Sequence, residues 1–290
     1  MLEFNIVIRQ ALIILLVSVL AGCTKLGALN TVLPKDDHTS EIIRDIAYGS
    51  HERQKLDIYI PRTESKSLPV VVFVYGGSWN SGRKQDYSFA GHALNSDEFI
   101  AVIPDYRLVP EVVYPDFLHD IADALNWTHS NIEKYGGQPN NLFLLGHSAG
   151  AYNAMMVGLA SNEFTSSRNR IPVQGVVGMA GPYNFIPLAT RVTKAAFGHL
   201  SDLTETQPAE YLNADSPALL LITGGSDQFV LPKHSQYLHQ YAQNKGVDSQ
   251  LVNYPEVGHI KLLLSLSKPF RGQTPALKDS VDFFRQNLSE

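Results

Sequence analysis

Residues 141–150 read NLFLLGHSAG and decide the fold. The first five are mostly apolar, as in a strand buried on both faces. Gly146 to Gly150 then match the pattern G-x-S-x-G, and helix-forming residues continue to Ala160. A strand, a sharp turn and a helix in this order hold a serine hydroxyl above the edge of a sheet, where the helix N-terminus favours negative charge. The stretch therefore predicts that Ser148 is a nucleophile.

Other apolar runs extend this strand into a sheet. Buried strands separated by helical patterns predict a mostly parallel sheet with helices on both faces, and the first two strands form an antiparallel pair. About eight strands fit, and besides 141–145 we expect them at 42–48, 55–60, 69–75, 99–103, 173–179, 218–222 and 250–254. Amphipathic helices follow Pro115 and end the chain. Residues 183–215 break this rhythm, so we expect a small cap over the carboxyl edge of the sheet.

A serine hydroxyl needs a base, and the base needs an acid that orients it. When the serine lies at such a strand–helix turn, the acid and then the histidine follow it along the chain. Asp227 comes after the strand ALLLIT and a glycine turn, and His259 comes after the strand SQLVNY. We therefore predict Asp227 as the acid and His259 as the base. His234 and His239 lie in a helical pattern, and we expect them on the solvated surface.

The charge that develops on the substrate oxygen needs backbone N–H donors. Ala149, directly after the nucleophile, supplies one, and we expect the other from Gly76 and Gly77 after the strand at 69–75. This loop, YGGSW from Tyr75 to Trp79, resembles the His-Gly-Gly-x-Trp loop of the arylformamidase and feruloyl-esterase-like branch of the α/β-hydrolases. It is also similar to the HGGG loop of the hormone-sensitive-lipase family. Tyr75 replaces the usual histidine, which leaves the bracing of the loop open.

A second segment carries the same resemblance, since residues 105–110, DYRLVP, are similar to the DYRLAP segment of that family. The resemblance implies the α/β-hydrolase fold and hydrolysis of a small-molecule carboxylic ester through an acyl-serine, with no cofactor. An arylformamidase or peptidase acting on the same three residues stays open, as does a non-catalytic binding module. In this setting we expect Arg107 and Asp120 to be structural, because buried charges need partners. Residues 78–90 and 183–215 would shape the pocket.

Composition excludes several other classes of protein. The chain has 290 residues, a net charge of −5 and no basic stripe, so nucleic acid is not expected as a partner. Only one cysteine is present, and no H-E-x-x-H pattern occurs, so we expect no metal site. The oligomeric state stays undetermined.

The N-terminus carries a short apolar run, Ala11 to Leu20, followed by Ala21-Gly22-Cys23. The run has the size of a signal-peptide core and is short for a bilayer span. Leu-Ala-Gly-Cys resembles a bacterial lipoprotein box, which implies cleavage after residue 22 and lipidation of Cys23. We therefore expect a signal peptide at 1–22, a tether at 23–40 and the hydrolase domain at 41–290. By the same resemblance, Thr24 after the cysteine favours the outer membrane of the bacterial cell envelope, with the domain facing the periplasm.

Overall fold

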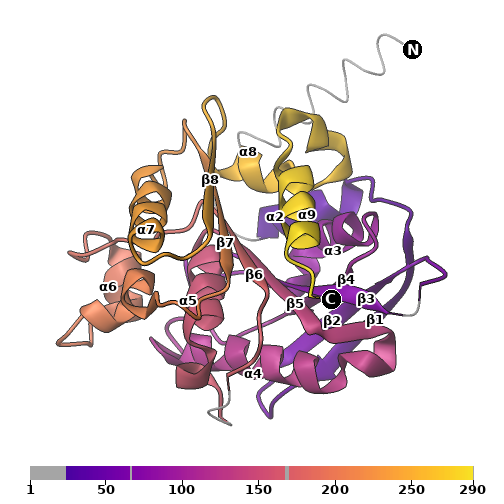
Figure 1. Ribbon diagram of the computed structural model, residues 1–290, viewed down its shortest axis with the longest axis horizontal. Coiled ribbons are helices and arrows are strands. Elements are labelled where there is room, and N and C mark those ends of the chain that lie inside the picture. Colours follow the sequence, from indigo (N-terminus) through magenta and orange to yellow (C-terminus); the bar gives the residue numbers. More distant parts are fainter. Residues whose placement is uncertain (1–23, 66, 167–169, 290) are drawn as a thin grey trace.

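The eight-stranded sheet expected from the apolar runs is present (Figure 1). The computed structural model describes residues 24–65, 67–166 and 170–289. Along the sheet the strands lie in the order β1-β2-β4-β3-β5-β6-β7-β8. β2 is antiparallel to both its neighbours, β1 and β4. The six strands β3 to β8 all run parallel to one another. The strands are β1 Thr39–Ala47, β2 Lys55–Pro61, β3 Leu68–Val74, β4 Ile100–Pro104, β5 Gly137–His147, β6 Gly175–Met179, β7 Ala218–Gly224 and β8 Ser249–Tyr254.

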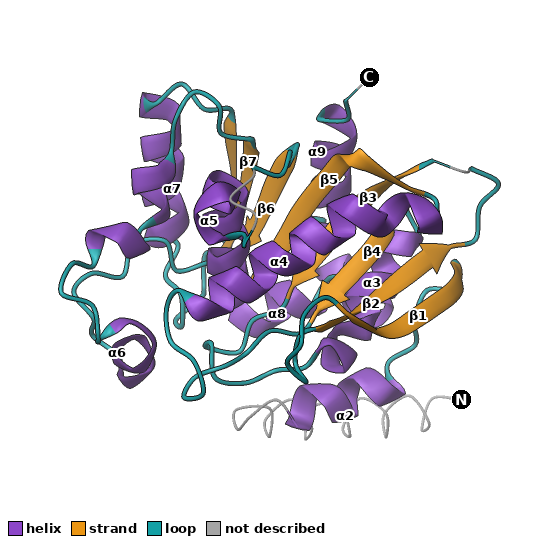
Figure 2. Ribbon diagram, turned by 90° about the horizontal axis from the view of Figure 1, so that it is seen from below, coloured by secondary structure: helices purple, strands orange, loops and turns teal. Residues whose placement is uncertain are grey.

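Helices cover both faces of the sheet, which explains why its central strands are apolar on both sides. α3 and α9 lie on one face, and α4, α5 and α7 lie on the other (Figure 2). Every residue of β4 and of β6 is buried. The fold is thus the α/β sandwich that the sequence predicts. The helices of these two layers are α3 Ser88–Asn95, α4 Asp116–Asn131, α5 Ala149–Phe164, α7 Lys233–Asn244 and α9 Ala276–Gln286.

The turn between β5 and α5 is strained in the way the G-x-S-x-G pattern predicts. Ser148 has φ 57° and ψ −127°, a conformation that L-residues rarely adopt. Its flanking glycines allow very close approach of neighbouring backbone. A Cβ on Gly150 would lie 2.1 Å from the carbonyl oxygen of Val74, and one on Gly146 would lie 2.3 Å from the carbonyl oxygen of Gly150. The turn therefore lifts Ser148 to the carboxyl end of β5.

The segment expected to be a cap, residues 183–215, contains three short helices. These are α6 Arg191–Phe197, η3 Thr204–Thr206 and η4 Pro208–Tyr211. Phe197 packs its ring 5.1 Å from that of Trp79 and 4.9 Å from that of Phe185. These aromatic contacts fix the segment against the loop that follows β3.

The tether expected at residues 23–40 is wrong for much of its length. Thr24–Val32 form helix α2, and β1 already begins at Thr39. Leu29 and Leu33 are 1% and 6% exposed and pack with Leu264. The side-chain amide of Asn30 donates to the carbonyl oxygen of Gln85 at 2.7 Å. The two leucines form too short a pattern to stand out in sequence, and they have a partner only because the fold brings Leu264 beside them.

The signal peptide and Cys23 lie outside the described residues. Within the described part of the chain, no helix is both long enough and apolar enough to cross a bilayer. The structure therefore leaves the predicted lipid attachment as an expectation.

The docking of α2 predicts a difference between two substitutions on the same helix. Leu29→Ser should free the helix, because burial of a leucine contributes about 1.5–3 kcal/mol. Amide hydrogen exchange at residues 26–33 should then rise by roughly tenfold or more. Val32→Ser is the matched control, since Val32 is 72% exposed. Equal exchange in the two variants would show that α2 is not held by this contact.

Candidate active site

The three side chains expected to act together form one chain of hydrogen bonds. The Nε2 atom of His259 lies 2.9 Å from the Oγ of Ser148. Its Nδ1 atom lies 2.6 Å from the Oδ2 of Asp227. Ser148 follows β5, Asp227 follows β7, and His259 is the first residue of helix α8, His259–Leu264, in the region after β8. The structure thus brings together residues separated by up to 111 positions at the carboxyl edge of the sheet.

The carboxylate of Asp227 is held from both sides. Its Oδ1 accepts hydrogen bonds from the backbone N–H groups of Phe229 and Val230 at 2.8 and 2.9 Å. Because a carboxylate only accepts, the Nδ1 of His259 must be the donor in their shared bond. The Nε2 of neutral His259 is then an unprotonated acceptor that faces the hydroxyl of Ser148. This is the tautomer that a general base requires.

A second histidine, His147, supports His259 and was not predicted. Its ring centre lies 4.6 Å from that of His259, and its Nε2 lies 3.1 Å from the carbonyl oxygen of His259. A carbonyl only accepts, so His147 donates from Nε2. Burial, reinforced by the nearby His259, lowers the pKa of His147 well below its usual range. His147 is therefore a neutral brace, and its place beside Ser148 in the motif is the signal that could have found it.

The glycine loop after β3 lies beside Ser148. Three successive residues, Gly77, Ser78 and Trp79, have φ values of 119°, 54° and 58°. A Cβ on Gly77 would lie 2.1 Å from the carbonyl oxygen of Ser81, and one on Gly76 would lie 2.7 Å from that of His147. The loop thus needs glycine both for its conformation and for its close contact with the turn at Ser148.

Of the three residues expected to form the oxyanion hole, Gly77 and Ala149 line the cavity beside Ser148, and Gly76 packs against the backbone of His147 at the turn. Ala149 is the first residue of α5. The first N–H groups of a helix have no partner within it, so the Ala149 N–H is available to a bound oxygen.

Tyr75 braces the loop in place of the usual histidine. Its hydroxyl donates to the Oδ1 of Asp105 at 2.7 Å and accepts from the Nη2 of Arg53 at 2.9 Å. The same Nη2 donates to the carbonyl oxygen of Gly82 at 2.8 Å, and the hydroxyl of Tyr106 donates to the backbone carbonyl oxygen of Tyr75 at 2.8 Å. The side chain of Tyr75 thus connects both ends of the loop to a buried carboxylate.

Stacking and charge add to this support. The ring of Tyr75 lies between those of Tyr87 and Tyr106, with centres 5.1 and 4.8 Å away. Burial raises the pKa of the Asp105 carboxyl, and its hydrogen bonds from Tyr75 and from the backbone N–H of Lys84 oppose that rise. Arg53, which sequence reasoning missed, belongs to no motif that could have identified it.

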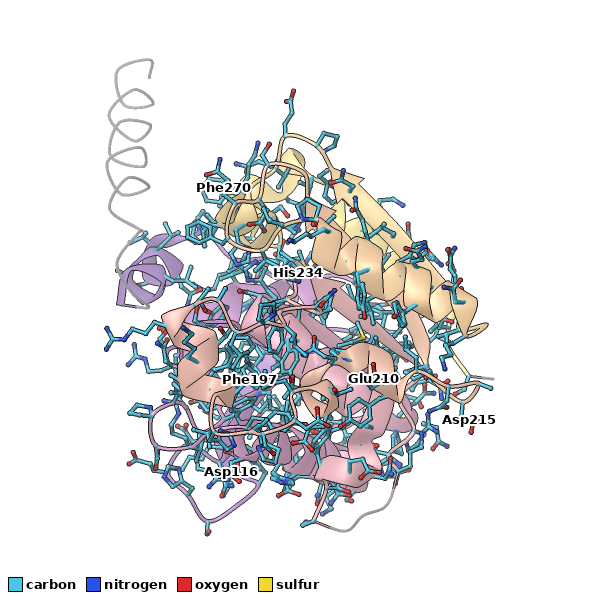
Figure 3. The ribbon with its side chains drawn as sticks, turned by 90° about the vertical axis from the view of Figure 1, so that its left-hand side faces the viewer. Asp116, Phe197, Glu210, Asp215, His234 and Phe270 are labelled. Carbon is cyan, nitrogen blue, oxygen red and sulfur yellow. The ribbon has the colours of Figure 1, made fainter. Side chains whose placement is uncertain are left out.

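A cavity of about 450 Å³ opens at Ser148 and is mostly apolar at its walls. It lies between the glycine loop, α6, α7, α8 and α2, on the side of the molecule where Figure 3 labels Phe197 and His234. The apolar residues of the lining include Leu26, Trp79, Phe185, Val192, Phe229 and Leu263.

His234 lies at this cavity, so its predicted place on the open surface is wrong. Its Nδ1 accepts the backbone N–H of Asn184 at 3.2 Å, and burial lowers its pKa. The start of α7 approaches residues 183–215, a contact that a helical pattern alone does not show.

Arg107 and Asp120 form a bidentate ion pair at 2.7–3.1 Å, in agreement with their expected structural role.

Metal-ligating residues do not gather in the described ranges, where no group of three or more His, Cys, Asp or Glu side chains could hold a metal ion.

The strand order and the hydrogen-bonded arrangement of Ser148, His259 and Asp227 define the α/β-hydrolase class of fold. A family model described as BD-FAE matches residues 56–241, and the chain belongs to that family.

Known proteins similar to the chain include esterases and a formamidase. Isoprenylcysteine alpha-carbonyl methylesterase ICME of Arabidopsis thaliana is 28% identical, with 84% of this chain and 62% of that protein covered. The chain thus spans about half to three fifths of the length of the plant relatives it matches. Kynurenine formamidase of Danio rerio is 22% identical over 83% of this chain and 82% of its own. The crystal structure of esterase B from Lactobacillus rhamnosis has a TM-score of 0.80 and 18% identity, and the match covers 96% of each chain.

Removing the Tyr75 hydroxyl should weaken both the fold and the activity. In Tyr75→Phe, the buried Asp105 loses one donor and Arg53 loses an acceptor, which should cost about 1–3 kcal/mol in the free energy of unfolding. Turnover of an ester should fall as the loop loosens. Tyr183→Phe is the control, because in the described structure the buried hydroxyl of Tyr183 has no hydrogen-bond partner. Urea unfolding and kcat should show a larger loss for Tyr75→Phe, and equal losses would contradict this role.

The low pKa of His147 predicts how stability depends on pH. Unfolding returns His147 to a pKa of about 6.5, so below that pH the unfolded chain binds a proton that the folded chain does not. His147 therefore contributes a loss of stability as pH falls below about 6.5, with a slope approaching 1.4 kcal/mol per pH unit. His147→Gln cannot take up this proton. Urea unfolding from pH 7 to 5 should give a shallower decline in the variant, and identical slopes would contradict the assignment.

Proposed function

We propose that the protein hydrolyses carboxylic esters of small molecules through an acyl-serine intermediate. The observation that carries this proposal is the continuous hydrogen-bonded chain from Asp227 through His259 to Ser148. In this arrangement the unprotonated Nε2 of His259 faces the hydroxyl of Ser148, and its Nδ1 donates to the carboxylate of Asp227. A non-catalytic module has no need for this tautomer or for the strained turn that presents Ser148.

The reaction follows from these positions. His259 accepts the proton of Ser148 as the Oγ attacks the ester carbonyl carbon. Charge develops on the carbonyl oxygen, and the N–H groups of Gly77 and Ala149 would stabilise it. The imidazolium of His259 is stabilised by Asp227 and gives its proton to the departing alcohol. Water, activated by the same His259, then releases the acid and restores the serine. No cofactor takes part in these steps.

The cavity supports a mainly apolar substrate. Leu26, Trp79 and Phe185 are among its walls, and His234 adds one polar ring to them. The backbone N–H donated to its Nδ1 leaves the Nε2 as the protonated nitrogen of neutral His234. An ester with apolar groups and one further hydrogen-bond acceptor suits these walls.

A formamide substrate is the second candidate, and the match to kynurenine formamidase favours it. The same three residues would serve both reactions, because each proceeds through an acyl-serine. Comparing kcat/KM for aryl esters, alkyl esters of increasing acyl length and a kynurenine-type formamide separates the two. Preference for the formamide would reassign the substrate and leave the mechanism intact.

We also propose that Cys23 carries lipid and holds the protein on a membrane of the bacterial cell envelope. The apolar run that ends at Leu20-Ala21-Gly22-Cys23 supports this proposal. Two or more acyl chains give stable anchoring, at about 0.8 kcal/mol per buried CH₂ group. Thr24 after the cysteine supports the outer membrane, with the domain in the periplasm.

Replacing the nucleophile tests the enzymatic proposal directly. Ser148→Ala should lower kcat for a short-chain aryl ester by roughly 10⁴-fold or more, because loss of a triad nucleophile removes acylation. The far-UV circular dichroism should be unchanged. Ser96→Ala, a half-buried serine at the end of α3, is the control and should retain activity. Comparable activity in the two variants would overturn the assignment.

Replacing the cysteine tests the anchor independently of the chemistry. Full-length protein expressed in a bacterium should fractionate with the envelope membranes, and the mass of the mature chain should start at a lipidated Cys23. Cys23→Ser should lack both properties, because its side chain has no thiol to modify. A mature wild-type protein that is free of lipid and found in the soluble fraction would refute the anchor.

A further inference from the structure

Exposed apolar side chains gather at the opening of the cavity. Phe229 and Ile260 line the cavity and are 69% and 38% exposed. Leu231 and Ile186 each directly follow a lining residue and are 45% and 42% exposed. We call these four residues the apolar rim. A cluster of exposed apolar side chains on a protein surface marks a site of interaction.

Exposed cations accompany the apolar rim. Where side-chain exposure is described, the exposed charged side chains within two residues of a cavity-lining residue are all positive: Arg83, Arg191, Lys194, Lys233 and Lys261. The carboxylates within the same distance along the chain are Asp86 and Asp227, and both are buried. We call these five cations the basic collar. The exposed charges next in sequence to the cavity lining are thus positive, although the whole chain carries a net charge of −5.

Helix α2 brings the N-terminal end of the domain to the same place. Leu26 of α2 lines the cavity. The helix begins at Thr24, the residue after Cys23. In Figure 2, α2 and α6 lie along the lower edge of the molecule, and the C-terminus lies at the opposite edge. The proposed site of lipid attachment is therefore next in sequence to a helix that forms part of the cavity wall.

We propose that the apolar rim and the basic collar form a membrane-contacting surface, so that the cavity opens onto an anionic bilayer. Exposed aromatic and aliphatic side chains enter the boundary between headgroups and acyl chains, and lysine and arginine bind anionic headgroups. A second copy of this chain fits less well, because a two-fold contact would place one basic collar against another. Esters dissolved in the bilayer would reach Ser148 without crossing water.

The orientation can be measured with a tryptophan placed on the rim. The full-length chain carrying Leu231→Trp is mixed with phosphatidylcholine vesicles that contain phosphatidylglycerol, with or without brominated acyl chains. The matched control is Leu288→Trp, which replaces a residue 41% exposed near the C-terminus. Bromine quenches only nearby indoles, so emission should fall several-fold more in Leu231→Trp than in the control. The emission of Trp79 and Trp127 in the unmodified chain is subtracted from both.

The basic collar is tested in the same chain. Adding Lys233→Glu and Lys261→Glu to Leu231→Trp should reduce its quenching toward the control value in vesicles rich in phosphatidylglycerol. Lys245→Glu and Lys278→Glu, at exposed lysines away from the cavity lining, should not.

Three results would overturn the proposal. They are no association with vesicles, equal quenching at positions 231 and 288, or quenching at position 231 that is the same with and without the charge reversals in the basic collar. An acidic protein or a soluble anion as the true occupant would give the first or second result. Quenching requires no turnover, so this outcome is separate from whether Ser148 hydrolyses esters. A Ser148→Ala chain should be quenched as strongly as the parent.

Discussion

The close contact between β5 and α5 at Ser148 is the constraint on which the site depends. Gly146 and Gly150 let the backbone turn back on itself beside β3, where any side chain would collide with a carbonyl oxygen. The strained φ of Ser148 is maintained because the paired strand β5 fixes one end of the turn and the buried helix α5 fixes the other. The other functional groups are then placed relative to this point, since β7, β8 and the loop after β3 all end at the same edge of the sheet.

Two separate sets of buried, hydrogen-bonded polar side chains lie around this turn. The first set runs from Asp227 through His259 to Ser148, and His147 donates to the backbone of His259. It positions the groups that would exchange a proton in the proposed reaction. The second set joins Arg53, Tyr75 and Asp105 by hydrogen bonds, and it holds the glycine loop in its conformation. Because every member of the second system is tied to backbone or to another charge, the replacement of histidine by tyrosine at position 75 leaves the loop supported.

Much of the fold was predictable because helices cover both faces of the sheet. Its strands therefore need apolar side chains on both faces and form uninterrupted apolar runs in the sequence. The positions of Ser148, Asp227 and His259 were predictable because each follows such a run. Other features depend on contacts between distant segments. The burial of Leu29 needs Leu264, and the place of His234 needs the approach of Asn184. Local hydrophobic periodicity does not reveal contacts between distant segments, so the sequence pattern alone predicts a tether where α2 lies and a surface position for His234.

The docking of helix α2 also bears on the proposed lipid anchor. A flexible tether of 18 residues, 23–40, would let a lipid-anchored domain turn freely and explore a volume tens of ångströms deep. With Thr24–Val32 helical and docked on the body, a lipid on Cys23 would begin at the domain itself. The reach of the catalytic centre would then be set by the thickness of the protein and no longer by chain length. Such an enzyme would process what lies at one surface and leave the surrounding solution almost unsampled.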